Sequence, residues 1–252
     1  MAVSLQAILN APIIELNSID STNNYAMWLI DADTAQQGLT IVAEQQTKGK
    51  GQRGKNWNDT PGESLLMSIV LTPVYDIEHQ FCFNMAISLA LADILQEMYE
   101  HWDVRIKWPN DIIVNDKKAG GVLIENVIRG NDWIYSVVGI GINIMQSSFS
   151  YELPFATSLH MESKQDISKF DFMSRLRERI IKYTMQYVTP ERLLNEYHNV
   201  LYKCGDNQRL AIGKNEFIGT VLGVTLDGML QVQLQGGDIA NYNHGAVEWV
   251  WG

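Results

Sequence analysis

Four strand-like runs follow one another between residues 104 and 144, and only short turns separate them. The runs are 104–108, 112–114, 121–128 and 133–144, with turns at 115–116 and 130–131. Strands joined by so few residues pair as antiparallel hairpins, because a parallel pair needs a crossover of a dozen or more residues. A long helix is predicted before them, over 78–102, where apolar residues recur at nearly helical spacing. The sequence therefore predicts an α+β fold with flanking helices on a mixed, largely antiparallel sheet, and it excludes a doubly wound parallel sheet.

The remaining elements indicate two domains. The first helix is expected to begin near Ser21, and two more are expected over 167–188 and 190–203. From residue 204 to 249 short strands alternate with glycine-containing turns, which favours a small antiparallel barrel. We therefore divide the chain into a large domain over 1–203 and a barrel domain over 204–252. Only about 20 residues precede the first expected helix, so we expect no DNA-binding helix-turn-helix.

Composition narrows the function classes. The formal net charge is -10, and 29 acidic residues would repel a nucleic-acid backbone, so we expect no DNA partner. Cys82 and Cys204 cannot form a disulfide framework, which indicates a reducing compartment. The N-terminus has no Lys or Arg before Lys48, against a secretory signal, and we expect no apolar run long enough to cross a bilayer. We therefore expect a cytoplasmic protein with no membrane partner.

The run Lys107-Trp108-Pro109-Asn110-Asp111 places a cation, a large ring, a rigid bend, an amide and a carboxylate side by side. Pro109 removes a backbone donor and biases Trp108 toward extended geometry, so we expect a strand with a bulge or bend that resumes at 112–114. Asn110 and Asp111 are then expected at the rim of a site. An ordinary turn is the alternative, because Pro-Asn-Asp is good turn chemistry and tryptophan is usually a core residue.

A basic, glycine-rich segment spans residues 48–55, with the sequence Lys-Gly-Lys-Gly-Gln-Arg-Gly-Lys. Its glycines let backbone N–H groups approach an anion, and its cations supply countercharge. The spacing matches G-x-G-x-x-G and nearly matches a P-loop, but both motifs must open directly into a helix. Here a turn and a strand-like run over 64–71 follow, and Asn56 replaces the Ser or Thr that would hold magnesium. We predict an anion-binding loop of another kind, with a mobile, solvated hairpin as the alternative.

Several motifs share the order and spacing of one enzyme family. They are Ser21-Thr22-Asn23, Gln46 with the glycine-rich loop and Trp57, the 107–111 run, the segment from Lys118 to Glu125, and Gly139-Ile140-Gly141-Ile142-Asn143. Together they resemble the biotin protein ligase family, in its monofunctional form without an N-terminal DNA-binding domain. The resemblance covers nearly the whole chain. It implies a catalytic domain similar to class II aminoacyl-tRNA synthetases, followed by an SH3-like barrel.

The resemblance also implies the chemistry. Biotin and ATP would give biotinyl-5'-AMP and pyrophosphate, and a lysine of a biotin carboxyl carrier protein or carboxylase domain would then take the biotin. The first step brings a carboxylate against an anionic phosphate, so fixed cations are needed where negative charge accumulates. By resemblance, Lys118 and then Lys107 are the catalytic candidates. A solvated turn lysine is the ordinary alternative for Lys118, as for its neighbour Lys117.

The resemblance assigns binding residues to each substrate. The biotin side comprises Ser21, Thr22, Asn23, Gln46, Lys50, Gly51, Gln52, Lys118, Gly121 and Gly141. The ATP and adenylate side comprises Gly49, Lys50, Gly51, Arg53, Gly54, Trp57, Asn110, Asp111 and Asn143, and Asp111 would also be a Mg²⁺ ligand shared with the phosphates. Taken alone, Ser21 or Thr22 could simply cap a helix.

Lys50 and Gln52 depart from the family pattern, which has arginines in those places. Gln52 carries no charge, and lysine lacks the bidentate fork of arginine, so we expect phosphate retention to be weaker or shared with Arg53 and Lys55. A lipoate ligase and a non-catalytic biotin-sensing module are the alternative functions. The ring-binding trio and Gln46 favour biotin over lipoate, whose flexible chain offers no ureido ring. A homodimer is left open.

Overall fold

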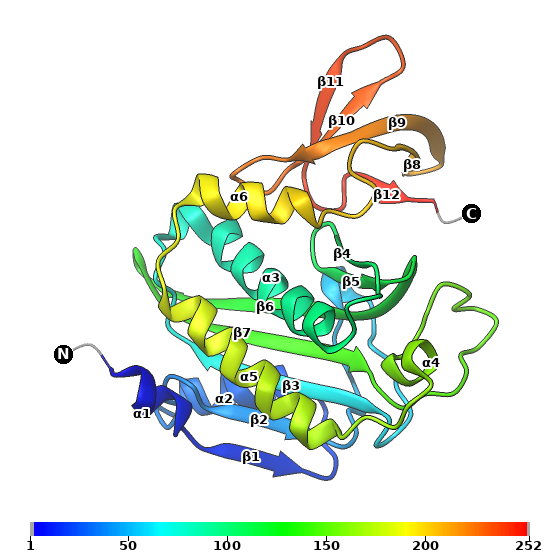
Figure 1. Ribbon diagram of the computed structural model, residues 1–252. Helices are drawn as coiled ribbons and strands as arrows, with labels where there is room; N and C mark the ends of the chain where they lie inside the picture. The colour runs from blue at the N-terminus through cyan, green and yellow to red at the C-terminus, as the bar shows by residue number, and fades with distance from the viewer. Residues whose placement is uncertain (1–2, 251–252) are drawn as a thin grey trace.

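The computed structural model describes residues 3–250, and its larger part is a seven-stranded sheet with helices on both faces (Figure 1). In spatial order its strands are β1 (Ile13–Leu16), β2 (Thr40–Ala43), β3 (Ser64–Leu71), β7 (Asp132–Asn143), β6 (Lys117–Arg129), β5 (Asp111–Val114) and β4 (Val104–Lys107). Strands β1 and β2 are parallel, and every other neighbouring pair is antiparallel. The predicted α+β class with a mixed, largely antiparallel sheet is confirmed.

Two apolar clusters hold the layers together. Helices α3 (Gln80–Met98), α5 (Lys169–Met185) and α6 (Pro190–Asn199) lie on one face of the sheet, where alternate side chains of β3 and β7 face the main core. Helix α2 (Thr22–Asp31) covers part of the opposite face through a smaller cluster that includes Ala26, Ile30 and Ile41. This smaller layer leaves parts of β6 and β7 free to line a pocket beside the start of α2.

Helix α3 corrects one expectation about membranes. With the turn before it, the helical segment Ile77–Met98 is long and apolar enough to cross a bilayer, because its most apolar stretch has a mean hydropathy of 1.3. The expectation that no apolar run is long enough was therefore wrong. In the structure 67% of the segment's most apolar stretch is buried, because α3 packs against α5, α6 and the sheet. Its apolar character is that of a central core helix.

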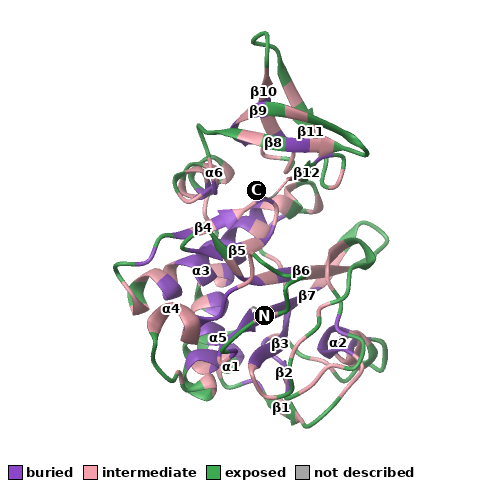
Figure 2. Ribbon diagram, turned by 90° about the vertical axis from the view of Figure 1, so that its right-hand side faces the viewer, coloured by how far each residue is buried: buried purple, intermediate pink, exposed green. Residues whose placement is uncertain are grey.

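The C-terminal residues form a second, smaller antiparallel sheet. Its order is β11 (Ile239–Tyr242), β10 (Leu230–Leu234), β9 (Asn215–Val224), β8 (Asn207–Ile212) and β12 (Glu248–Trp249). Figure 2 shows that most of its residues are exposed or partly buried, whereas the buried residues concentrate in the large sheet and α3. The prediction of an SH3-like fold for this C-terminal part is confirmed. The exact domain boundary between residues 203 and 204 stays a prediction. Residues 1–2 and 251–252, at the outer ends of the two predicted domains, lie outside the described residues.

Three local expectations were wrong. Helix α2 starts at the expected place but is not the first helix, because α1 (Leu5–Leu9) and β1 precede it. The 107–111 run does not interrupt one strand: Lys107 pairs with Asp111 across a hairpin, and the chain reverses there. No helix was expected between residues 144 and 167, but a short helix, α4 (Leu159–Ser163), lies there.

Candidate active site

A pocket of about 540 Å³ lies where the glycine-rich loop, the ends of β6 and β7, the start of α2 and the C-terminal sheet meet. This volume is in the usual range for small-molecule sites. Lysine and arginine side chains outnumber carboxylates in its lining, although the chain as a whole is acidic. The pocket therefore combines a positive region with the polar groups at the start of α2, and it suits an anionic small molecule.

The start of α2 forms the polar end of the pocket. Ser21 is the N-cap residue, yet its hydroxyl makes no capping hydrogen bond, and it is 1% exposed. The backbone N–H and the hydroxyl of Thr22 both donate to Oε1 of Gln46, at 2.8 and 3.1 Å. The simple capping alternative therefore does not describe Ser21, and Gln46 is held against the helix start from 24 residues away.

Asn23 is fixed from both sides by residues that the sequence analysis did not single out. Its Oδ1 accepts a hydrogen bond from the buried Ser68 hydroxyl at 2.6 Å, and its Nδ2 donates to Oε2 of Glu125 at 2.7 Å. The other oxygen of Glu125 lies 3.3 Å from the ammonium of Lys50. Glu125 thus connects the polar end of the pocket to the glycine-rich loop.

Two glycines of β7 make room for these groups. Gly139 and Gly141 are two residues apart, so they face the same side of the sheet. A Cβ at Gly139 would lie 2.3 Å from Oδ1 of Asn23, and one at Gly141 would lie 2.7 Å from the indole of Trp57. Both positions therefore require glycine, Gly139 for close packing against Asn23 and Gly141 for close packing against Trp57.

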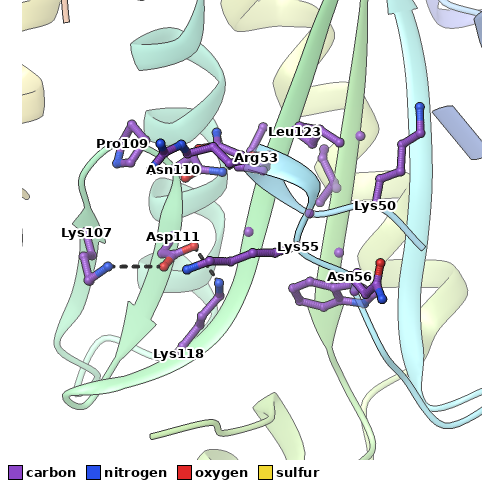
Figure 3. Close-up of a pocket in the computed structure, with 18 of the residues that line it drawn as sticks. Lys50, Arg53, Lys55, Asn56, Lys107, Pro109, Asn110, Asp111, Lys118 and Leu123 are labelled. Carbon is purple, nitrogen blue, oxygen red and sulfur yellow. Dashed lines mark hydrogen bonds and ion pairs between the residues drawn. The ribbon is translucent and has the colours of Figure 1, made fainter. Parts of the chain in front are cut away.

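Lys107, Asp111 and Lys118 form the cationic end of the pocket (Figure 3). The Lys118 ammonium lies 2.7 Å from Oδ1 of Asp111, and the Lys107 ammonium lies 3.5 Å from Oδ2. Burial alone would raise the pKa of Asp111, but the two ammonium groups hold it below its ordinary value. Burial lowers the pKa of Lys107, and Asp111 opposes that shift. One carboxylate therefore balances two closely spaced cations, which leaves a net positive charge.

A β-bulge places Lys118 in this group. Asp111 pairs with Gly121 and Ile112 with Gly120, but Ile113 pairs with Lys118, so Ala119 is the extra residue on β6. Without the bulge, Lys118 would pair with Val114 and its side chain would point to the face opposite Asp111, because alternate residues face opposite sides. The irregular register thus brings the second cation onto the ligand side of the sheet.

The glycine-rich loop is folded over the pocket. The backbone N–H of Trp57 donates to the Gly49 carbonyl at 2.9 Å, and the backbone N–H of Gly51 donates to the Lys55 carbonyl at 2.7 Å. In Figure 3 the Lys55 side chain extends toward Asp111 and Lys118, whereas Lys50 points away from them. The buried Gln52 Oε1 and Trp57 Nε1 have no hydrogen-bond partner within residues 3–250, and both residues line the pocket. A bound ligand could satisfy both atoms.

Most of the predicted site residues come together here. The pocket is lined by Ser21, Thr22, Asn23, Gln46, Lys50, Gly51, Gln52, Arg53, Trp57, Lys107, Asn110, Asp111, Lys118, Gly121 and Gly141. Three predicted residues do not line it: Gly49 packs against the Trp57 carbonyl, Gly54 lies on the outer turn, and Asn143 donates to the Thr157 carbonyl at 2.9 Å. Asn110, expected at a rim, is 7% exposed and donates to the Val122 carbonyl.

The lining also contains residues that the sequence analysis missed. From the large domain these include Asn56, Leu123 and Gly139, and from the C-terminal sheet they include His244, Gly245, Val247, Glu248 and Trp249. Gly139 could have been found, because it shares the face of Gly141 in the Gly-Ile-Gly-Ile-Asn run. The C-terminal residues had no local signal, since they approach the pocket only through the packing of the two sheets.

The fold and the pocket fit a protein that binds an anionic small molecule in a cavity with one polar end and one cationic end. Residues 15–143 match the model of the biotin/lipoate A/B protein ligase family. A bifunctional ligase/repressor BirA from Bacillus spizizenii is 30% identical over 239 residues, which are 91% of this chain and 72% of that protein. The chain therefore belongs to the biotin/lipoate A/B protein ligase family.

Two further relatives agree with this placement. The bifunctional ligase/repressor BirA of Escherichia coli is 32% identical over 126 residues, 50% of this chain and 38% of that protein. A solved structure of the Aquifex aeolicus biotin protein ligase, in complex with biotin and ATP, superimposes with a TM-score of 0.78. It is 24% identical, and the match covers 94% of this chain and 99% of that one. This structural likeness supports the shared fold.

Proposed function

We propose that this protein is a biotin protein ligase, which activates biotin with ATP and transfers it to a lysine of a biotin carboxyl carrier protein or carboxylase domain. The observation that supports this most strongly is the single cavity with the Ser21–Asn23 end and the Lys107–Lys118 end. A ureido ring needs both donors and acceptors, which the polar end supplies. The carboxylate of the same ligand would then reach the cationic end, where a nucleotide phosphate can meet it.

In the first step a carboxylate oxygen of biotin attacks the α-phosphorus of ATP, and the bond to the β-phosphate oxygen breaks. Biotinyl-5'-AMP forms and pyrophosphate leaves with the electron pair of the broken bond. The ammonium groups of Lys118 and Lys107 reduce the repulsion between the two anions and stabilise the charge that accumulates on the phosphorus oxygens. Asp111 keeps the two lysines in place, because each of its oxygens is paired with one of them.

In the second step the neutral amine of the acceptor lysine attacks the acyl carbon of the adenylate. An amide bond forms, the bond between the acyl carbon and the phosphate oxygen breaks, and AMP leaves. The amine loses one proton in the process, and this proton passes to water. Lys118 remains beside the phosphate oxygen that becomes the leaving group, so the same cation assists both steps.

The residues present do not fit a metal site held by the protein alone. Asp111 was the expected ligand, but both of its oxygens are paired with lysines. Within residues 3–250 no group of three or more His, Cys, Asp or Glu side chains could hold a metal ion. We therefore propose that Mg²⁺ enters bound to the phosphates of ATP, without a metal ligand from the chain.

The function is tested by offering the protein Mg²⁺-ATP with radiolabelled biotin or radiolabelled lipoate, together with a carrier domain. A biotin protein ligase releases pyrophosphate and labels the carrier with biotin but not with lipoate. Label from lipoate would instead identify a lipoate ligase. Binding of biotin without pyrophosphate release would identify a sensing module.

We expect Gly139→Ala to weaken biotin binding about tenfold, by loss of hydrogen bonds that together contribute about 1.4 kcal/mol. The new methyl group overlaps Oδ1 of Asn23, so Asn23 must leave Ser68 and Glu125. Titration calorimetry with biotin measures the change. Gly121→Ala is the comparison, because its Cβ would meet Asp111 Oδ1 at 3.5 Å, an ordinary contact, and it should weaken biotin binding less. Equal affinities of wild type and Gly139→Ala would exclude Asn23 from the biotin site.

We expect biotin plus ATP to slow tryptic cleavage within residues 48–57 by about threefold or more, because closure over the adenylate protects the loop. The loop offers cleavage sites after Lys50, Arg53 and Lys55. Cleavage after the exposed Lys214, which does not line the pocket, is the internal control and should not change. Mass spectrometry of timed samples distinguishes the sites. If loop cleavage stayed constant relative to Lys214, ligand-driven closure would be wrong.

A further inference from the structure

The glycine-rich loop is attached to the C-terminal sheet by one arginine. Nη1 of Arg53 donates to the Gly245 carbonyl at 2.9 Å, across 192 positions of sequence. A Cβ at Gly245 would lie 1.8 Å from Nη1 and 1.9 Å from Cζ, so the guanidinium lies directly against this glycine. Arg53 itself has a φ of 55°, which is uncommon for a residue other than glycine. The loop is thus held in an unusual conformation at the point where it contacts the other sheet.

The segment 244–249 is also attached to the cationic strands of the large domain. The His244 ring packs edge-on against Trp108, with 5.7 Å between centroids, and the Lys107 ammonium lies 5.6 Å from the centre of a Trp249 ring. Trp108 Nε1 donates to the Gly228 carbonyl at 2.9 Å. The C-terminal segment therefore has a fixed position beside the cationic end of the pocket, and not only a contact with the loop.

A second charged contact at this junction contributes little. The carboxylate of Glu248 lies 4.0 Å from the Lys55 ammonium, and both side chains are mostly exposed, at 65% and 77%. Exposed pairs of this kind contribute about 0–1 kcal/mol. The Arg53–Gly245 contact is therefore the principal attachment, because it combines a hydrogen bond from a cation with flat packing against a residue that has no side chain.

We propose that Arg53 is a positioning residue that fastens the glycine-rich loop to Gly245, and that residues 244–248 form the wall of the pocket on its nucleotide side. This inference rests on the proposed function and adds that nucleotide binding depends on the C-terminal sheet. It also changes the role expected for Arg53, because its guanidinium is occupied by Gly245 in the ligand-free protein. Phosphate contacts from the loop then fall to Lys55 and the backbone N–H groups, because Lys50 is paired with Glu125.

The test compares two glycine substitutions that carry the same backbone strain. Gly245 has a φ of 81° and Gly237 a φ of 96°, so alanine is strained at both sites. Only at Gly245 does the new methyl group meet Arg53, since a Cβ at Gly237 has no described atom within 4 Å. Gly245→Ala should increase the rate of tryptic cleavage of the loop in the ligand-free protein about tenfold. It should also raise the KM for ATP about tenfold. Biotin affinity should be unchanged, and Gly237→Ala should show neither effect.

Arg53→Ala provides a second test that places no strain on the C-terminal sheet, because Arg53 is exposed on the loop. It should reproduce the higher KM for ATP and faster cleavage after Lys50 and Lys55. The proposal is overturned if Gly245→Ala matches Gly237→Ala in both measurements, or if Arg53→Ala leaves both unchanged. Loop cleavage without ligands does not require any ligase activity, so a failure of the proposed function would be recognised separately, by absent pyrophosphate release in the wild type.

Discussion

Lys118→Ala should slow biotinyl-adenylate formation by about 100-fold or more while biotin binding is retained. The loss corresponds to about 3 kcal/mol of barrier, by analogy with the removal of one donor from an oxyanion site. The ammonium of Lys118 lies 2.7 Å from Asp111 and 6.0 Å from the centre of the Trp57 ring, so it is held between the carboxylate and the ring that covers Gly141. Biotin and the α-phosphate both carry negative charge, and this fixed cation is needed most when they join.

Lys117→Ala is the matched control for this experiment. Lys117 is the adjacent residue on β6, carries the same charge and is exposed, but it does not line the pocket. Pyrophosphate release with saturating biotin and ATP gives the rate, and calorimetry gives the biotin affinity of each variant. We expect Lys117→Ala to behave as the wild type. A rate for Lys118→Ala within about threefold of the wild type would contradict its catalytic role.

The bulge that orients Lys118 shows where sequence reasoning reaches its limit. The hairpins of β4 to β7 and the buried strand β3 were predictable, because turn residues and periodicity are local signals. A bulge at Ala119 changes which face a side chain points to, yet Lys117 and Lys118 have the same chemistry and equal local propensity. The family resemblance singled out Lys118, but the physical reason is the pairing register, which is a property of two strands.

The site was predictable as far as its parts lie in compact motifs. The polar end at Ser21 to Asn23 and the cationic end at Lys107 to Lys118 come from motifs in the first half of the chain, and the structure brings them together. The residues that fix Asn23 were not predicted, since Ser68 belongs to a run that reads as an ordinary strand and Glu125 only ends a motif with no role assigned to it. The wall at His244 depends on the contact between two sheets, which no local pattern encodes.

Helix α5 carries another feature that no local pattern encodes, a buried cation within an apolar stripe. Arg177 occupies a core position, four residues from both Met173 and Ile181, and is 6% exposed. Its guanidinium donates to Thr40 Oγ1 at 2.8 Å and to four backbone carbonyls, those of Ile8, Leu9, Ala11 and Gly38. These oxygens belong to the end of α1 and the start of β2, so one side chain joins three segments. Burial lowers the pKa of Arg177, but an arginine in this setting remains charged.

Arg177→Met should lower the free energy of unfolding by about 3 kcal/mol or more, because it leaves several buried oxygens without a donor while keeping most of the side-chain volume. Urea denaturation followed by fluorescence measures the change, and a lower midpoint with a similar slope is expected. Lys182→Ala on the same helix is the control, since its pair with Glu178 is about half exposed and contributes about 0.5 kcal/mol at most. If Arg177→Met were as stable as Lys182→Ala, α1 and β2 would have to be held by their apolar contacts alone. The buried guanidinium of Arg177 would then contribute nothing to the stability of the contacts among α1, β2 and α5.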